Sequence, residues 1–122
     1  MSSRESGGLA APAGYVMVQT AVDGEDAAAR LADGIVASRL AACVQTGRVR
    51  STYRWRGKVE RADECILTAK TRGELAERLI AHIRAAHPYE VPEIVVTPIV
   101  GGFGPYLEWL EAETETAPGP GA

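Results

Sequence analysis

Residues 49–71 read VRSTYRWRGKVERADECILTAKT, and this stretch decides the fold. Along residues 49–56 apolar or small side chains alternate with arginine and threonine, a period of two that is typical of a β-strand. The segment around Gly57 predicts a tight turn, and residues 64–70 predict the returning strand. Together they predict a long hairpin. Hairpins of this length often extend past their own sheet and pair with another edge.

Two elements are predicted before the hairpin. Residues 15–21 predict a strand, which ends at the turn signal Asp23-Gly24. Asp23 is suited to be the N-cap of a helix with acidic residues in its first turn. The apolar face of that helix has near-helical spacing and carries Ala27, Leu31, Ile35 and Ser38. Residues 40–44 then lead into the first strand of the hairpin.

Three elements are predicted after the hairpin. The sequence TRGE at 71–74 has the pattern of a capping box and predicts a helix that Pro88 ends. Residues 93–99 are nearly all apolar, which predicts a strand in the centre of the sheet or covered on both faces. Residues 105–113 predict a short terminal helix. The expected core contacts of the two helices are Leu75, Leu79, Ile83 and Ala86 for the first, and Leu107, Trp109 and Leu110 for the second.

The predicted order is therefore β-α-β-β-α-β followed by a short C-terminal helix. This is the ferredoxin-like α+β plan, a four-stranded antiparallel sheet with two helices on one face. The other face is left bare, and a bare face beside a long hairpin predicts self-association. The domain is expected at 14–115, between a disordered leader at 1–13 and a disordered tail at 116–122.

Composition narrows the classes of function. The 122 residues are 46% hydrophobic and 24% charged, as expected for one globular domain. The net charge of −3 gives no reason to expect nucleic-acid binding. No apolar run approaches the roughly 20 residues that span a bilayer, and the start lacks the apolar core of a secretory signal. We therefore expect a cytoplasmic protein that binds neither membranes nor nucleic acids.

Catalytic signatures are lacking, so we expect a binding protein and not an enzyme. The sequence has no glycine-rich phosphate loop, no Gly-x-Ser-x-Gly and no His-Glu-x-x-His. Cys43 and Cys65 have no metal-ligand or redox spacing, and we expect reduced, packed thiols. A nucleophilic role would need a histidine brought close by the fold. Contact between the two cysteines across neighbouring strands stays open.

The loop after the second helix concentrates groups that can bind a ligand. His87, Glu90 and Glu93 offer imidazole and carboxylates, which suit Zn²⁺ or Cu²⁺, and two prolines stiffen the segment. Neutral imidazole is needed for binding, so affinity would fall below about pH 6. The alternative is that His87 caps its helix and Tyr89 packs against the core.

The hairpin also carries a stripe of positive charge. It consists of Arg48, Arg50, Arg54 and Arg56. One interpretation is an anion site for phosphate or carboxylate ligands. The other, which we favour, is a solvated face, or subunit salt bridges to acids such as Glu60 and Glu64.

Five segments, taken in order between about Val16 and Glu113, carry a resemblance to a known family: Leu40-Ala41-Ala42-Cys43-Val44, Ser51-x-Tyr53-x-Trp55-x-Gly57-Lys58, Lys70-Thr71, His87-Pro88-Tyr89-Glu90-Val91-Pro92-Glu93 and Tyr106-Leu107-x-Trp109-Leu110. In these segments the chain closely resembles the CutA family of divalent-cation tolerance proteins. The resemblance implies a ferredoxin-like subunit, a tight homotrimer whose hairpins pair between neighbours, and a link to copper and heavy-metal tolerance without an established enzymatic activity.

In such a trimer the 87–93 loop could meet the neighbour's hairpin. We expect a cleft, or a subunit interface, walled by the side chains Tyr53, Trp55, Lys70 and Tyr89. The trimer also resembles that of the PII signalling proteins. This favours an alternative function, a regulatory or scaffolding trimer that binds a small anionic ligand or a partner protein.

One departure from the family pattern concerns copper. Some bacterial members are assigned a cysteine late in the first strand, a histidine just before the His-Pro-Tyr motif, and the final glutamate of that motif. Here these positions correspond to Gln19, Ala86 and Glu93, so only the glutamate matches. Without the thiolate, a soft Cu(I) ion loses its best ligand.

Overall fold

The computed structural model describes residues 14–115. Eight elements follow one another in this stretch: β1 (Tyr15–Val22), α1 (Glu25–Ala37), β2 (Cys43–Trp55), β3 (Lys58–Arg72), the 3₁₀ turn η2 (Gly73–Leu75), α2 (Ala76–Ala86), β4 (Ile94–Ile99) and α3 (Gly104–Ala112). The predicted leader at 1–13 and tail at 116–122 lie outside the described residues.

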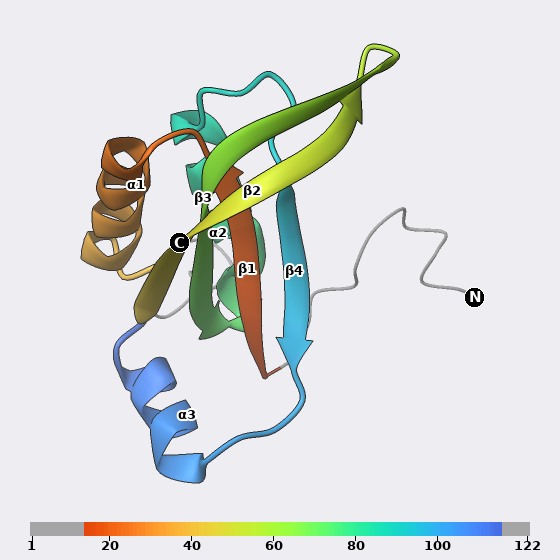
Figure 1. The fold of residues 1–122 in the computed structure, drawn as a ribbon. Helices are drawn as coiled ribbons and strands as arrows, with labels where there is room; N and C mark the ends of the chain where they lie inside the picture. The colour runs from red at the N-terminus through yellow and green to blue at the C-terminus, as the bar shows by residue number, and fades with distance from the viewer. Residues whose placement is uncertain (1–13, 116–122) are drawn as a thin grey trace.

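The four strands form one antiparallel sheet in the order β2-β3-β1-β4 (Figure 1). The ferredoxin-like prediction is confirmed. The core lies between the sheet and the two helices α1 and α2, because alternate strand residues such as Val16, Val18 and Leu67 are buried together with Leu31, Ile35, Leu79 and Ile83 of the helices. This alternation is the period-two pattern of strands that have one face covered.

The expected position of the last strand was wrong. β4 is an edge strand of the described sheet and pairs only with β1. Pro98 lies within it, opposite Val16. Proline has no backbone N–H to donate to a second neighbour, so it is tolerated at an edge and not in the centre of a sheet.

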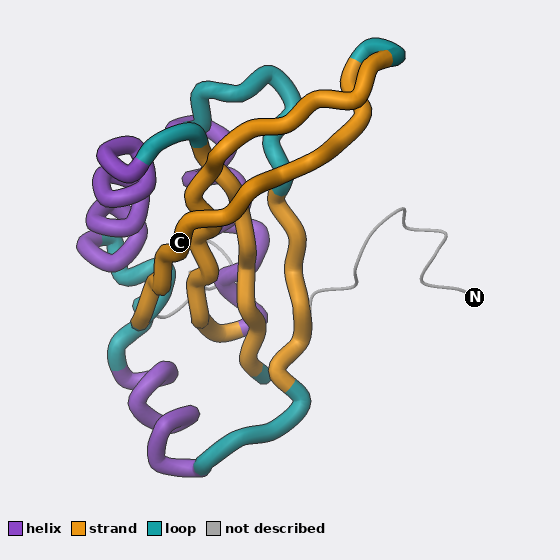
Figure 2. Tube along the Cα trace, viewed as in Figure 1, coloured by secondary structure: helices purple, strands orange, loops and turns teal. Residues whose placement is uncertain are grey.

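The long hairpin is confirmed, and half of it projects from the sheet (Figure 2). The β1–β3 ladder ends where Val22 faces Cys65, so beyond that point residues 49–64 pair only with each other. At the tip Arg56 has φ 51° and Gly57 has φ 82°. Two successive positive φ values define the mirror-image turn whose twist matches that of the flanking strands.

The short helix α3 covers part of the face predicted to be bare. Tyr15, Lys70 and Arg72 point to the face opposite α1 and α2, because they alternate with buried residues. The Tyr15 hydroxyl donates to Glu111, and Lys70 lies 5.8 Å from the ring centre of Tyr106. Only the end of the face away from the hairpin tip is covered in this way.

Several predicted helix contacts and caps were wrong. Asp23 does not cap α1, whose N-cap is Gly24 without a side-chain hydrogen bond. The TRGE segment forms no capping box, because Thr71 still belongs to β3 and its buried hydroxyl has no partner in the described chain. Among the expected core contacts, Ser38, Ala86 and Trp109 are exposed, whereas Leu110 of α3 is fully buried.

Candidate functional site

A groove of about 970 Å³ lies at the hairpin end of the open sheet face, away from α3. Its walls come from the projecting part of β2 and β3, the end of β1, and the loop between α2 and β4. The lining includes five acidic residues: Asp23, Asp63, Glu64, Glu90 and Glu93. The carboxylate of Asp63 pairs with Arg50, on the other face of the hairpin from Glu64. The lining also includes three aromatic side chains: Tyr53, Trp55 and Tyr89. Five of these eight residues, the three aromatics with Glu90 and Glu93, are among the predicted site residues. The sequence analysis expected them in a cleft between neighbouring chains, whereas in this groove they line a hollow within a single chain.

His87 is buried and uses both of its ring nitrogens within the chain. Its Nδ1 accepts a hydrogen bond from the backbone N–H of Tyr89 at 3.2 Å, so Nε2 carries the proton that it donates to the carbonyl of Ala21 at 2.8 Å. Its ring also makes an edge contact with Tyr89, with 4.7 Å between ring centres. Because no lone pair remains free, His87 holds the loop against β1 in this conformation and offers no ligand atom to a metal.

Tyr89 ties the loop to the hairpin. Its hydroxyl donates to Glu64 Oε2 at 2.7 Å, and the ring is half-buried. Burial, followed by this hydrogen bond to the carboxylate, raises the pKa of Tyr89 well above its ordinary value. The phenol therefore stays protonated and fixes one wall of the groove.

Glu90 and Glu93 have polar partners of their own. Glu90 pairs with Arg56 of the hairpin turn at 3.4 Å, and both side chains are exposed. Glu93 Oε2 accepts from the side-chain amide of Gln19 at 2.9 Å. Gln19 and Glu93 thus satisfy each other, and the side chain of Ala86 has no donor atom.

The residues do not form a ready-made metal centre. Between residues 14 and 115, no three His, Cys, Asp or Glu side chains stand close enough together to hold an ion. The predicted set of His87, Glu90 and Glu93 is therefore not brought together as three ligands in one chain. Two exposed carboxylates remain, Glu90 and Glu93, and each already has one polar partner within the chain.

Lys70 does not line the groove. It lies at the other end of the same sheet face, beside Tyr106. The three acids that sequence reasoning missed are Asp23, Asp63 and Glu64. They are distant from the 87–93 loop in sequence. The strand register places Glu64 opposite Val49, on the hairpin face that carries Tyr53 and Trp55, and this register is known only from the structure.

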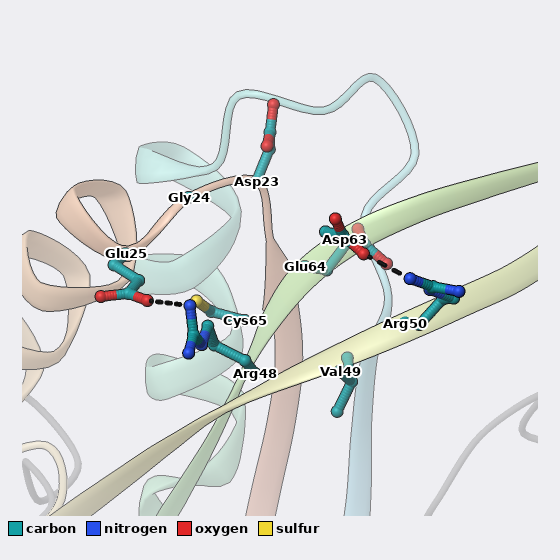
Figure 3. Close-up of a pocket in the computed structure, with 9 residues that line it drawn as sticks. All are labelled: Asp23, Gly24, Glu25, Arg48, Val49, Arg50, Asp63, Glu64 and Cys65. Carbon is teal, nitrogen blue, oxygen red and sulfur yellow. Dashed lines mark ion pairs between the residues drawn. The ribbon is translucent and has the colours of Figure 1, made fainter.

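The arginine stripe is partly neutralised within the chain. Arg48 pairs with Glu25 at 3.3 Å, and Arg50 pairs with Asp63 at 3.6 Å, beside a second pocket of about 490 Å³ (Figure 3). That pocket is lined by four acids as well as these two arginines. The geometry counts against an anion site. The acids that pair with Arg48 and Arg50 are Glu25 and Asp63 of the same chain, and not the expected Glu60 and Glu64.

The two cysteines are both free thiols. Cys43 faces Lys70 and Cys65 faces Arg48 in the β2–β3 ladder, so they are not cross-strand neighbours. The possibility of contact between them is thereby excluded in this fold.

Comparison with known proteins decides the family. The model of the family described as "CutA1 divalent ion tolerance protein" matches residues 16–113. This chain belongs to the CutA1 family. The divalent-cation tolerance protein CutA of Thermus thermophilus is 40% identical over 99 residues, which cover 80% of this chain and 96% of that protein. The chloroplastic protein CutA of Arabidopsis thaliana is 43% identical over 100 residues, which cover 81% of this chain.

The chain spans about half the length of the plant and mouse CutA proteins that it matches. Solved CutA1 structures agree with the fold. The CutA1 structure from Oryza sativa superimposes with a TM-score of 0.83 at 38% identity, covering 88% of this chain and 100% of that one. The Cut A1 structure from Thermus thermophilus gives 0.79 at 39% identity, covering 83% and 99%. None of the helices within residues 14–115 has the length and apolar character needed to cross a membrane.

Proposed function

We propose that this CutA1 family member is a cytoplasmic homotrimer that binds divalent cations, Cu²⁺ and Zn²⁺ among them, as part of a response to heavy metals. The observation that supports cation binding is the groove, whose lining has five acidic residues and no lysine or arginine. Two of the five, Asp63 and Glu90, are paired with arginines that lie outside the lining, which leaves a net negative charge. A cleft lined by charges of one sign concentrates ions of the other.

Glu90 and Glu93 are the proposed ligands. The Arg56–Glu90 pair is exposed, and exposed pairs contribute little to stability, so an incoming cation replaces it at small cost. Glu93 uses Oε2 for Gln19, which leaves Oε1 outside that bond. Carboxylate oxygens with bound water suit Zn²⁺ or Cu²⁺ better than Cu(I), which prefers thiolate. The ion is cargo held by surface carboxylates and not a resident cofactor.

The trimer is proposed because two strand edges of the sheet have no partner strand in the described chain. The outer hairpin, residues 49–64, and the outer edge of β4 both carry backbone groups without a strand partner in the described chain. Pairing between copies satisfies such groups, and a closed ring leaves no edge free.

Calorimetric titration with Zn²⁺ and Cu²⁺ tests the site. We expect Glu90→Gln and Glu93→Gln each to weaken binding severalfold, and the double variant to abolish it, because each substitution removes one anionic ligand. Glu108→Gln on α3 is the matched control, since it removes one exposed carboxylate outside the groove. If the parent and all four variants bind equally, the groove is not the cation site.

The pH dependence identifies the ligand type. Carboxylic acids lose their proton near pH 4 and imidazoles near pH 6.5. With carboxylate ligands we expect affinity to persist at pH 6 and to fall only as the pH approaches 4. A fall centred between pH 6 and 7 would instead indicate that His87 leaves its hydrogen bonds and binds the ion.

The alternative is a PII-like trimer that binds a small anion or a partner protein. The two pockets described above contain more acids than bases, which counts against an anionic ligand. Titration with common nucleotides in the same calorimeter addresses it. Saturable nucleotide binding without metal binding would replace the proposal with this alternative.

A further inference from the structure

A third pocket, of about 390 Å³, lies between α1 and α2, on the side of the sheet opposite the open face. It is therefore separate from the hairpin, the β4 edge and the open face, which are the surfaces assigned to contacts between copies. Its inner wall is apolar, because Val22 of β1 and Leu31 of α1 line it and are buried. Ala27 and Ala86 are small side chains on the two helices, and they leave room for a ligand between them.

The charge of this interhelical pocket is opposite to that of the groove. Two basic side chains line it, Arg30 on α1 and His82 on α2, and none of its described lining residues is acidic. Neither of the two forms an ion pair within residues 14–115. Asp26 and Asp33 lie about one turn to either side of Arg30 on α1, but both are outside the lining. A cleft lined by charges of one sign attracts a ligand of the other, so this pocket selects an anion.

The imidazole of His82 is held in place by the backbone of α1. A Cβ added to Gly34 would lie 3.6 Å from His82 Nε2, which is an ordinary contact distance, and the histidine is half-buried at this point. Arg30 precedes Gly34 by four residues, so the two lie on the same face of α1. The imidazole and the guanidinium therefore border one opening. A ring that is positioned before the ligand arrives loses less conformational entropy on binding.

We propose that the interhelical pocket binds a small carboxylate with an aliphatic body. The body packs against Val22 and Leu31, and the carboxylate accepts hydrogen bonds from Arg30 and His82. Guanidinium binds carboxylates in a bidentate geometry, and an imidazole ring has one N–H to donate even when it is neutral. An inorganic anion would leave the apolar wall unused. The volume lies within the range of about 300–1,000 Å³ typical of small-molecule sites. This site is additional to the proposed cation site and does not depend on it.

Titration of the full chain with sodium hexanoate, followed by the amide signals in NMR spectra, tests the inference. The salt is kept at about 0.15 M NaCl so that weak surface attraction is screened. The comparison ligands are 1-hexanol, which has the same chain and no charge, and inorganic phosphate, which has charge and no chain. We expect saturable shifts of the amides near Leu31, Gly34 and His82 with hexanoate. The Kd of hexanol should be about fivefold higher or more, because it forms no charge-assisted hydrogen bonds. Phosphate should cause no saturable shifts there.

Four variants assign the site. Arg30→Gln and His82→Gln should each raise the Kd of hexanoate, the first by about fivefold, because a charged hydrogen-bond donor is lost. Arg84→Gln is the matched control, since it removes an exposed arginine of α2 outside the pocket, and should leave the Kd unchanged. Gly34→Ala adds a methyl group beside His82 without a clash, and alanine favours the helix. It should therefore raise the Kd without lowering stability in urea unfolding, which a purely structural role would not explain.

Three results would overturn the inference: no saturable binding of hexanoate between the helices, equal affinity for hexanoate and either comparison ligand, or an unchanged Kd in both Arg30→Gln and His82→Gln. Zn²⁺ titration of the same proteins separates this proposal from the proposed function. We expect Arg30→Gln to bind Zn²⁺ as the parent does, because the two sites are on opposite faces of the sheet. Zn²⁺ binding without hexanoate binding would leave only the cation site, and the reverse result would leave only the carboxylate site.

Discussion

His87 illustrates how a residue suited to metal binding can serve structure instead. Its ring bridges the end of β1, through the Ala21 carbonyl, and the loop, through the Tyr89 amide. Both contacts require the neutral ring in one tautomer. By fixing the start of the loop, His87 places Tyr89 against Glu64 and so shapes the groove wall.

We expect His87→Ala to lower the free energy of unfolding by about 2–3 kcal/mol, since it removes two hydrogen bonds and leaves a cavity. Urea unfolding measures this. His82→Ala on α2 is the control, because His82 is only half-buried, and should cost less than about 1 kcal/mol. A His87→Ala protein as stable as the parent, but unable to bind Zn²⁺, would restore His87 as a ligand.

Tyr89 predicts a response to alkaline pH. Its pKa is raised by burial and by its hydrogen bond to Glu64, so the folded chain holds this proton more tightly than the unfolded chain. The resulting stabilisation is complete below the ordinary tyrosine pKa of 10.0 and is lost as the pH rises above it. Unfolding measured between about pH 8 and pH 11 should therefore show a shallower loss of stability in Tyr89→Phe than in the parent.

Below pH 8 the Tyr89→Phe protein should be less stable than the parent by about 1 kcal/mol, the usual contribution of one hydrogen bond. Parallel pH curves for the two proteins would show that the Tyr89 proton does not contribute. Tyr15→Phe provides a comparison, because Tyr15 also donates to a carboxylate, Glu111, and its pKa is also raised, first by that hydrogen bond.

At the scale of elements, the projecting hairpin positions the aromatic wall. Its tip is a two-residue mirror-image turn, with Gly57 at φ 82°. L-residues rarely adopt this conformation, whereas glycine does so readily. The hairpin therefore depends on Gly57 for backbone conformation and not for space, since nothing lies within 4 Å of a Cβ placed there.

Gly57→Ala should destabilise the hairpin by about 1 kcal/mol through backbone strain. Hydrogen exchange of the amides between 49 and 64 should speed up more than exchange in β1. Gly47→Ala is the matched control in β2, because a Cβ there also meets nothing within 4 Å and the backbone lies outside the left-handed region. Equal effects of the two substitutions would show that turn conformation is not what stabilises the tip.

At the scale of the whole molecule, the open sheet face has three parts. Helix α3 covers the end near Tyr15 and Lys70, and the groove occupies the hairpin end. Between these two parts lie Met17, which is half-buried and directly opposite Lys70, and Gln19. In a trimer this middle part would be covered by other copies.

Light scattering should give three times the chain mass of 12.9 kDa. Met17→Lys should reduce that mass at micromolar concentration, because it places a charge in the proposed contact. Val36→Lys is the control, since Val36 is exposed on α1, away from this face. A monomeric parent would refute the trimer. A Met17→Lys protein with the same mass as the parent would show that the contact between copies does not include Met17.

Sequence alone determined the elements and their order. Strand and helix periods, the turn at Gly57 and the break at Pro88 are set by neighbouring residues, so residues 49–71 predicted the hairpin correctly. The cluster of aromatic and acidic residues from the hairpin and the 87–93 loop was also predicted in part, because each motif is local.

Only the tertiary structure decided which partners each side chain meets. The edge position of β4, the two hydrogen bonds of His87, the place of Lys70 beside α3 and the acids contributed by β3 all depend on contacts between distant segments. The same imidazole ring can act as a metal ligand or as a buried bridge between two hydrogen-bonding partners. Burial and the position of a carbonyl from another strand determine which role it takes, and sequence spacing carries no information about either.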